Sequence, residues 1–198
     1  MNLRRVFLAI AFSAIASSCQ KGGGSAGGPG ASASSSAPPP LDTSWERDPG
    51  HLLTSGEAAP NFEGVAHTGM RVRLSAFLEK PVVVYFYGAD RSSEATTTAR
   101  AFRDDWMRLM ETASMVIGVS ADDRVTHRDF ATGEKLPFLL VADEKNAIAK
   151  AFGVPVDNGR CRAVTFVVGK DGKIARVLDA TPPEGQSAAV LKALEVLP

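Results

Sequence analysis

The chain has 198 residues, with 22 basic and 22 acidic side chains and a formal net charge of zero. A protein that binds nucleic acid needs a basic surface to neutralise phosphates, so this balanced composition argues against a nucleic-acid partner. Charge runs are short and mixed in sign, as on an ordinary solvated surface.

The N-terminus has the features of an export signal. Two arginines precede an apolar run at residues 6–15, which is too short to remain in a bilayer as a spanning helix, and small residues then lead to Cys19. This order resembles the signal of bacterial lipoproteins, in which residues 1–18 are removed and the cysteine carries lipid, although Ala16 stands where that signal usually has leucine. The A-I-A sequence that ends at Ala16 also fits ordinary secretion, which would leave a soluble periplasmic or secreted protein.

A tether is predicted at residues 19–50, beginning with the lipidated cysteine. It contains GGGSAGGPGASASSSAPPP and offers almost no side chains to bury, so it is expected to be a flexible coil that stiffens at three consecutive prolines. A coil of ~25 residues spans roughly 25–30 Å on average. We therefore expect a protein of the bacterial cell envelope, with the membrane as a partner through the lipid on Cys19.

Residues 51–198 are predicted to form one folded domain, since about 150 residues can bury a substantial core. Its first half begins with a strand covered on both faces at residues 82–87 (VVVYFY) and a helix at 93–112, which Ser92 or Ser93 can cap. A strand at 115–119, a helix at 123–133 that ends at a glycine and a strand at 138–142 follow.

The second half of the domain has a helix at 145–152, two strands at 164–168 and 174–178 that an Asp-Gly turn joins into a hairpin, and a final helix at 186–197. Short extended pieces at 61–62 and 72–74 precede these elements. Crossovers of helix length imply parallel strands, and the hairpin adds antiparallel ones. The order predicts an α/β fold of the thioredoxin-like type, a three-layer sandwich with a mixed central sheet and helices on both faces.

Short motifs along residues 56–197 resemble those of one family, in the same order. They are APNF at 59–62, LSAF at 74–77, VYFY at 84–87, FRD at 102–104, GVS at 118–120, LPF at 136–138, AKAFGV at 149–154 and TFVV at 165–168 followed by KDGKI. The chain thus resembles the peroxiredoxins of the alkyl hydroperoxide reductase and thiol-specific antioxidant family, in the branch of the bacterioferritin-comigratory proteins. The resemblance implies a thioredoxin fold and, for an active member, thioredoxin-dependent peroxidase activity through a cysteine, without a cofactor.

In that family the site follows the first buried strand as P-x-x-x-T-x-x-C, with a resolving cysteine often five residues further on and an arginine two residues before the T-F of a later strand. The resemblance places these five positions, in that order, on Gly88, Ser92, Ala95, Arg100 and Ala163. Only Ser92 keeps the chemistry, as a hydroxyl. Peroxide reduction needs a thiolate, and alanine has no lone pair to attack an O–O bond, so we expect this site to have lost its peroxidatic chemistry.

Cys161 is the one cysteine within residues 51–198, so no internal disulfide is expected. It lies between Arg160 and Arg162, and two nearby cations can lower the pKa of a thiol. A relocated nucleophile or a redox-sensing thiol is therefore one hypothesis, and an ordinary loop cysteine with its arginines facing water is the other. A local slip could also bring Arg162 to the place of the lost family arginine, although strand geometry favours the opposite direction.

Other polar residues offer weaker candidates. The threonines at residues 96–98 lack an assignable base and orienting acid, so helix capping and a solvated helix face are favoured over a hydrolase site. His51, His67 and His127 are far apart in the chain, so no metal site is predicted. Trp45 is expected to dock the end of the tether on the domain.

The favoured interpretation is a peroxiredoxin-like domain that serves as a non-catalytic binding or structural module at the cell envelope. A second copy of the chain or another envelope protein is its expected partner. Two alternatives remain from the sequence. One is a thiol-dependent peroxidase or redox sensor that acts through Cys161, and the other is a small-ligand binder that uses the peroxide pocket, enlarged by the loss of side chains.

Overall fold

The computed structural model describes residues 44–197, so the predicted signal peptide, Cys19 and nearly all of the tether lie outside the described residues. Within residues 44–197, no helix combines the length and the hydrophobicity needed to cross a membrane. The folded unit starts before the predicted boundary at residue 51, because Trp45 is buried in the core together with Leu53. The expected docking role of Trp45 is thereby confirmed.

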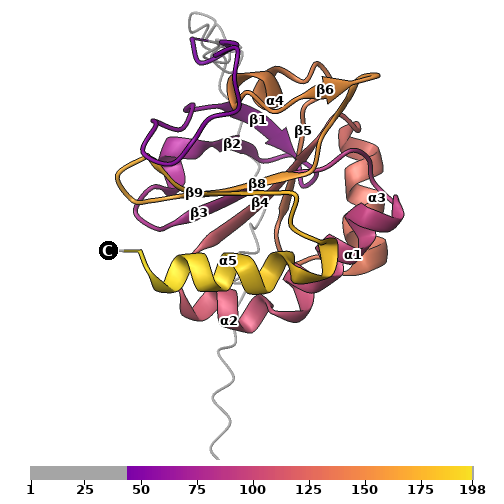
Figure 1. The fold of residues 1–198 in the computed structure, drawn as a ribbon. Helices are drawn as coiled ribbons and strands as arrows, with labels where there is room; N and C mark the ends of the chain where they lie inside the picture. Colours follow the sequence, from indigo (N-terminus) through magenta and orange to yellow (C-terminus); the bar gives the residue numbers. More distant parts are fainter. Residues whose placement is uncertain (1–43, 198) are drawn as a thin grey trace, which may run out of the picture. The chain divides into compact units, whose positions relative to one another are not determined.

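A seven-stranded mixed sheet forms the centre of the domain, in the order β2-β1-β5-β4-β3-β8-β9 (Figure 1). Its strands are β1 (Glu63–Ala66), β2 (Arg71–Arg73), β3 (Val82–Phe86), β4 (Met115–Ser120), β5 (Leu139–Ala142), β8 (Val164–Val168) and β9 (Ile174–Asp179). The three strands β3, β4 and β5 are parallel to one another, and the remaining neighbours pair in antiparallel fashion. This is the α/β sandwich with a mixed sheet that the sequence predicts.

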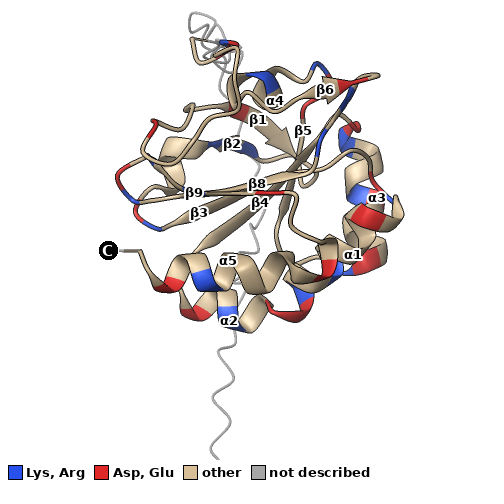
Figure 2. Cartoon of the chain, in the orientation of Figure 1, with Lys and Arg blue, Asp and Glu red and all other residues tan. Residues whose placement is uncertain are grey.

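Helices cover both faces of the sheet (Figure 1). One face carries α1 (Ser93–Asp104), α2 (Trp106–Glu111), α3 (Arg124–Glu134) and α5 (Gln186–Glu195), and the other carries α4 (Ala147–Ala151) and the 3-10 turn η1 (Leu74–Phe77). A second 3-10 turn, η2 (Pro183–Gly185), leads into α5. Acidic and basic residues are both distributed over the helices and loops (Figure 2), in keeping with the balanced composition.

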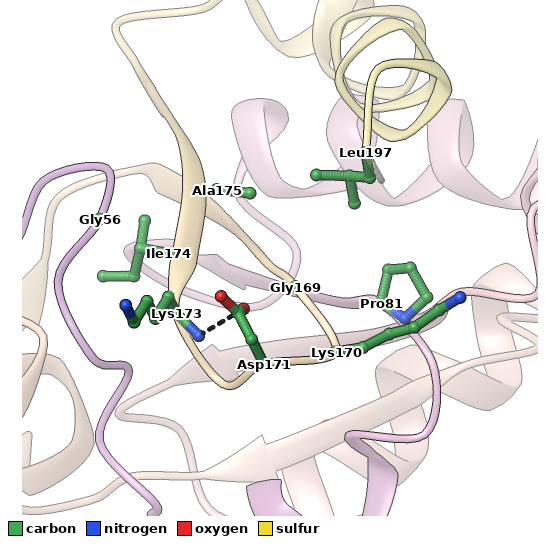
Figure 3. A pocket seen from close by; sticks show the side chains of 9 residues that line it. All are labelled: Gly56, Pro81, Gly169, Lys170, Asp171, Lys173, Ile174, Ala175 and Leu197. Carbon is green, nitrogen blue, oxygen red and sulfur yellow. Dashed lines mark hydrogen bonds between the residues drawn. The ribbon is translucent and has the colours of Figure 1, made fainter.

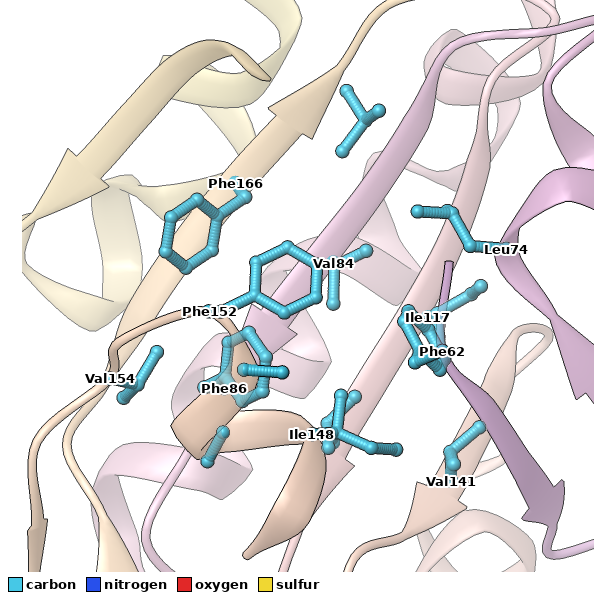
Figure 4. Close-up of a cluster of buried hydrophobic side chains, with 14 of the residues drawn as sticks. Phe62, Leu74, Val84, Phe86, Ile117, Val141, Ile148, Phe152, Val154 and Phe166 are labelled. Carbon is cyan, nitrogen blue, oxygen red and sulfur yellow. The ribbon is translucent and has the colours of Figure 1, made fainter. Parts of the chain in front are cut away.

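The alternation of side chains along β3 supplies two separate cores. Val84 and Phe86 pack on the α4 face, whereas Tyr85 and Tyr87 pack on the α1 face. Both sets are buried, which is why the strand reads as an uninterrupted apolar run. Figure 4 shows the core of the α4 face, with Phe62, Leu74, Val84, Phe86, Ile117, Val141, Ile148, Phe152, Val154 and Phe166.

Three local features differ from the predictions. The helix predicted at 93–112 is interrupted at Asp105, whose carboxylate accepts a hydrogen bond from the Ser187 hydroxyl at 2.7 Å. The helix predicted to end at Gly133 continues to Glu134, and Lys135 takes the left-handed conformation with a φ of 54°. A small unpredicted hairpin, β6 (Val156–Asp157) and β7 (Arg160–Cys161), carries the cysteine.

Candidate functional site

The junction between β3 and α1 is built around a capped helix start. The Ser92 hydroxyl accepts a hydrogen bond from the backbone N–H of Ala95 at 3.1 Å and donates one to the carbonyl of Ala89 at 2.9 Å. This cap satisfies one of the donors that a helix leaves unpaired in its first turn. The helix therefore begins at Ser93, as predicted, and Ala95 lies in its first turn.

Ala95 belongs to the apolar core at this junction. Its side chain is only 2% exposed and lies in the same buried cluster as Tyr85, Ala99 and Phe102. The Ala95 methyl group is thus part of the hydrophobic core on the α1 face of the sheet.

The sheet brings most of the predicted positions to one end of β3. Gly88 and Ser92 lie in the loop between β3 and α1. Val164 of β8 pairs with Phe86, so Ala163 lies where β8 approaches the same end of β3. Arg100 does not join them. Its guanidinium is exposed and binds Glu134 of α3 with two hydrogen bonds of 2.7 and 2.9 Å.

The structure corrects the prediction for Cys161. Its side chain is 4% exposed and its Sγ donates a hydrogen bond to the carbonyl of Tyr87 at 3.1 Å. Burial, reinforced by the charge of Asp143, raises the pKa of the Cys161 thiol to about 12. The prediction that the flanking arginines lower this pKa is wrong, because a buried thiol loses the hydration that a thiolate needs.

The flanking arginines point to other partners. Arg160 donates to the carbonyl of Gly88 at 3.1 Å, and Arg162 pairs with Asp179 at 2.8 Å. The guanidinium of Arg162 is therefore engaged by Asp179 and does not provide the arginine that the resemblance expects at position 163. Cys161 also lies in the core of the α4 face, whereas Ala95 lies in the core of the α1 face, so the sheet separates the two side chains.

A buried polar cluster beside the junction was missed by the sequence analysis. We name Tyr87, Asp90 and His127 the Tyr–Asp–His cluster. His127 Nδ1 lies 2.8 Å from Asp90 Oδ2, the Tyr87 hydroxyl donates to Asp90 Oδ1 at 2.8 Å, and the Asp90 and His127 side chains are 1% and 0% exposed. Burial, followed by the neighbouring Tyr85 and Asp90, raises the pKa of Tyr87 well above its usual value. The contact between Asp90 and His127 joins residues 37 positions apart, so no local sequence pattern predicts it.

The histidines of the described chain do not converge on a metal. His51 is exposed and contacts Glu57 at 3.2 Å, and His67 accepts a hydrogen bond from the backbone N–H of Leu140 at 3.1 Å. Burial lowers the pKa of His67, with a further contribution from nearby His127. Within residues 44–197, no group of three or more His, Cys, Asp or Glu side chains is arranged to hold a metal ion.

A cavity of about 430 Å³ lies beside the turn between β8 and β9, and Figure 3 shows the side chains that line it. It is lined by Gly56, Pro81, Gly169, Lys170, Asp171, Lys173, Ile174, Ala175 and Leu197. Pro81 precedes β3, whereas Ser92 and Ala95 follow it, so the cavity lies at the opposite end of that strand. This cavity is therefore not the peroxide pocket, and it does not support the hypothesis of a small ligand bound there.

Comparisons with known proteins identify the family. The model of the AhpC/TSA family matches residues 55–177. The chain belongs to the AhpC/TSA family. Among relatives of this AhpC/TSA protein, the chloroplastic peroxiredoxin Q of Oryza sativa subsp. japonica is 39% identical over 151 residues, which cover 73% of this chain and 68% of the relative.

Solved structures that resemble the AhpC/TSA domain also come from peroxiredoxins of the peroxiredoxin Q and bacterioferritin-comigratory type. Peroxidoxin BcpB from Mycobacterium tuberculosis shares 27% identity and has a TM-score of 0.70, with 74% of this chain and 99% of that chain covered. Peroxiredoxin Q from Xanthomonas campestris, at 24% identity, has a TM-score of 0.67 over 74% of this chain and 97% of its own, and it supports the fold. The AhpC/TSA chain is thus a peroxiredoxin of the peroxiredoxin Q and bacterioferritin-comigratory type with a thioredoxin-like fold.

Proposed function

We propose that this AhpC/TSA domain has lost the peroxidatic cysteine of its family and serves as a non-catalytic binding or structural module at the bacterial cell envelope. The observation that carries the proposal is Ala95, a buried methyl group in the first turn of α1, where the family resemblance locates the attacking sulfur. An alanine cannot form the sulfenic acid through which a thiol reduces a peroxide.

The surroundings of Ala95 support the same proposal. A reactive thiolate is stabilised by a helix N-terminus and by a neighbouring cation. Here Glu94 adds a negative charge to the first turn of α1, and position 163 has a methyl group in place of a guanidinium. Cys161 does not compensate, because its thiol is buried on the opposite face of the sheet with a raised pKa.

The direct test is peroxide consumption by the full chain. Hydrogen peroxide and a small organic hydroperoxide would be supplied with a thiol reductant. The chain carrying Cys19→Ser, which keeps Cys161 as its one cysteine, would be compared with the chain carrying both Cys19→Ser and Cys161→Ser. We expect both proteins to stay at the background rate of the reductant. Turnover that disappears in Cys161→Ser would overturn the proposal in favour of a thiol peroxidase.

A second experiment separates the loss of the sulfur from the loss of the whole site. Ala95→Cys alone is expected to remain far below the turnover of an active peroxiredoxin Q, because Ala163 supplies no positive charge for the thiolate. The double variant Ala95→Cys with Ala163→Arg is expected to exceed the single variant. Full activity of Ala95→Cys alone would show that the remainder of the site is intact.

The cell-envelope part of the proposal rests on the N-terminal sequence. Metabolic labelling with a fatty acid is expected to mark the wild type and to fail with Cys19→Ser. Absence of label from both proteins would favour ordinary secretion, and equal label in both would show that Cys19 is not the lipidated residue. The partner would be a second copy of the chain or another envelope protein, and light scattering of the purified chain distinguishes a dimer from a monomer.

A further inference from the structure

The Tyr–Asp–His cluster ties the loop after β3 to the first turn of α3. Asp90 comes from that loop and His127 from α3, and their side chains meet at 2.8 Å in a region with almost no solvent exposure. Tyr87, the residue directly after β3, donates its hydroxyl to the same carboxylate and lies 3.3 Å from His127 Nδ1. The Asp90 carboxylate therefore depends on both donors, since no water replaces a partner lost at a buried site.

Backbone groups of the same loop are held as well. The N–H of Asp90 donates to Asp122 Oδ2 at 2.6 Å, and Asp122 Oδ2 also accepts from the Ser120 hydroxyl at 2.9 Å. The carbonyl of Gly88 accepts from Arg160 at 3.1 Å. The loop is thus restrained from β4, from α3 and from the β6–β7 hairpin before α1 begins.

A surface contact extends the same connection along α1. Arg100 and Arg103 both donate hydrogen bonds to Glu134 at the end of α3. Arg100 binds the Glu134 carboxylate, and Arg103 binds the Glu134 backbone carbonyl at 3.0 Å. Exposed ion pairs contribute little, whereas removing a hydrogen-bond partner of a buried carboxylate leaves it with an unmet hydrogen bond that no water replaces. The buried Asp90–His127 pair is therefore the stronger connection between the loop and α3.

We propose that the Tyr–Asp–His cluster holds the β3–α1 junction closed, with Asp90 and His127 as positioning residues for the first turn of α1. The junction then opens rarely, and position 95 stays out of contact with solvent and small molecules. The inference deepens the proposed function and rests on it, because a junction that opens rarely suits a site that no longer has to receive a substrate. It concerns access to the junction, which can be measured without any peroxide.

A thiol introduced at position 95 can report on opening. In the full chain carrying Ala95→Cys, iodoacetamide is added at pH 8 and the modified peptides are mapped by mass spectrometry, which reads position 95 separately from Cys19 and Cys161. We expect alkylation at position 95 to be at least about 100-fold slower in the folded chain than in urea, since only the open state reacts. Adding His127→Leu, which removes one of the two side-chain partners of the Asp90 carboxylate, is expected to accelerate alkylation by about 10-fold to 100-fold.

Two matched variants make the test specific. His127→Asn keeps an N–H donor near the place of Nδ1 and is expected to restore most of the slow rate. Arg128→Gln removes an exposed pair with Asp129 within the same helix and is expected to leave the rate unchanged. The Ala95→Cys reporter is used in every case, so a difference between variants is independent of any turnover by the unmodified chain.

Hydrogen exchange distinguishes local opening from general destabilisation. In His127→Leu, we expect faster exchange at residues 88–96 and unchanged exchange in the core of β4, at residues 116–119. The proposal is overturned if position 95 is alkylated quickly without any change at His127. It is also overturned if His127→Leu has no effect on alkylation, or if it accelerates exchange equally in β4 and at the junction.

Discussion

Ala95 and Cys161 lie on opposite faces of one sheet, and each has only one of the features that a reactive thiol requires. Position 95 has the capped first turn of a long helix, but its side chain is a methyl group. Position 161 has the sulfur, but it is buried in an apolar core next to the Asp143 carboxylate. The comparison shows that neither a helix N-terminus nor a thiol makes a redox site alone, because the thiolate must form where its charge is stabilised.

The largest expected effect concerns the thiolate of Cys161. A pKa raised from 9.0 to about 12 lowers the thiolate fraction at pH 8 by roughly 1000-fold. We therefore expect iodoacetamide to modify Cys161 in the native chain about 1000-fold more slowly than in the urea-unfolded chain, with a small free thiol of ordinary pKa as the reference for the reagent. Similar rates in the two states would break the comparison, since Cys161 would then be as available as an ordinary thiol.

Removal of the Asp143 charge tests how this carboxylate affects stability and the pKa of Cys161. Burial raises the pKa of Asp143 to about 6, above its usual value near 3.8, so the folded chain prefers the protonated carboxyl. Its contribution to the free energy of unfolding is therefore largest below about pH 4 and is lost as the pH rises through 6. The total loss is on the order of 3 kcal/mol, because the pKa differs by about two units between the folded and unfolded chain.

The measurement is urea unfolding of the wild type and Asp143→Asn between pH 4 and 7. The wild type is expected to lose stability relative to the variant as the pH rises, and the pKa of Cys161 is expected to fall in the variant, since Asp143 helps to raise it. A difference in stability that is constant over this range would contradict the assignment.

The helix cap on the Ala95 side predicts a smaller effect. Ser92→Ala removes the hydroxyl that accepts from the N–H of Ala95 and should lower the free energy of unfolding by about 1 kcal/mol. Ser93→Ala is the matched control, because that neighbouring side chain is exposed. Equal losses from the two variants would mean that the helix start is not fixed by Ser92.

The smallest effect is expected at Arg100, the position that the resemblance gives to a resolving cysteine. Arg100→Gln breaks its exposed pair with Glu134, and the thermal midpoint should fall only slightly. The difference should vanish at high salt, which screens exposed charges. A large decrease in the thermal midpoint that does not depend on salt would contradict this prediction, because it would show that the exposed contact contributes strongly to stability.

Local patterns were enough to predict the framework around Ala95. The apolar run of β3, the cap at Ser92 and the helix start at Ser93 each depend on neighbours in the chain, and each is found in the structure. Family resemblance added the correct fold and the alignment of position 95 with the first turn of α1. The packing of the junction followed from those two features together.

Long-range contacts explain what the sequence did not predict. Cys161 lies in a hairpin of two-residue strands, which are too short to show a hydrophobic periodicity in the sequence. Its burial was therefore not predicted, and the flanking arginines indicated a lowered pKa where burial raises it. The interruption at Asp105 coincides with a hydrogen bond from α5, and the Tyr–Asp–His cluster joins residues from separate crossovers. Such contacts arise only once the sheet is assembled.

The burial of Trp45 has a practical consequence for anyone producing this domain. The indole fills space beside Leu53 and Ala151, so a recombinant fragment that starts at residue 51 would expose a hole in the α4-side core. Loss of a buried tryptophan side chain typically costs about 3–5 kcal/mol, a large part of the stability of a small domain. Expression boundaries placed before Ser44 keep this residue and with it the intact folded unit.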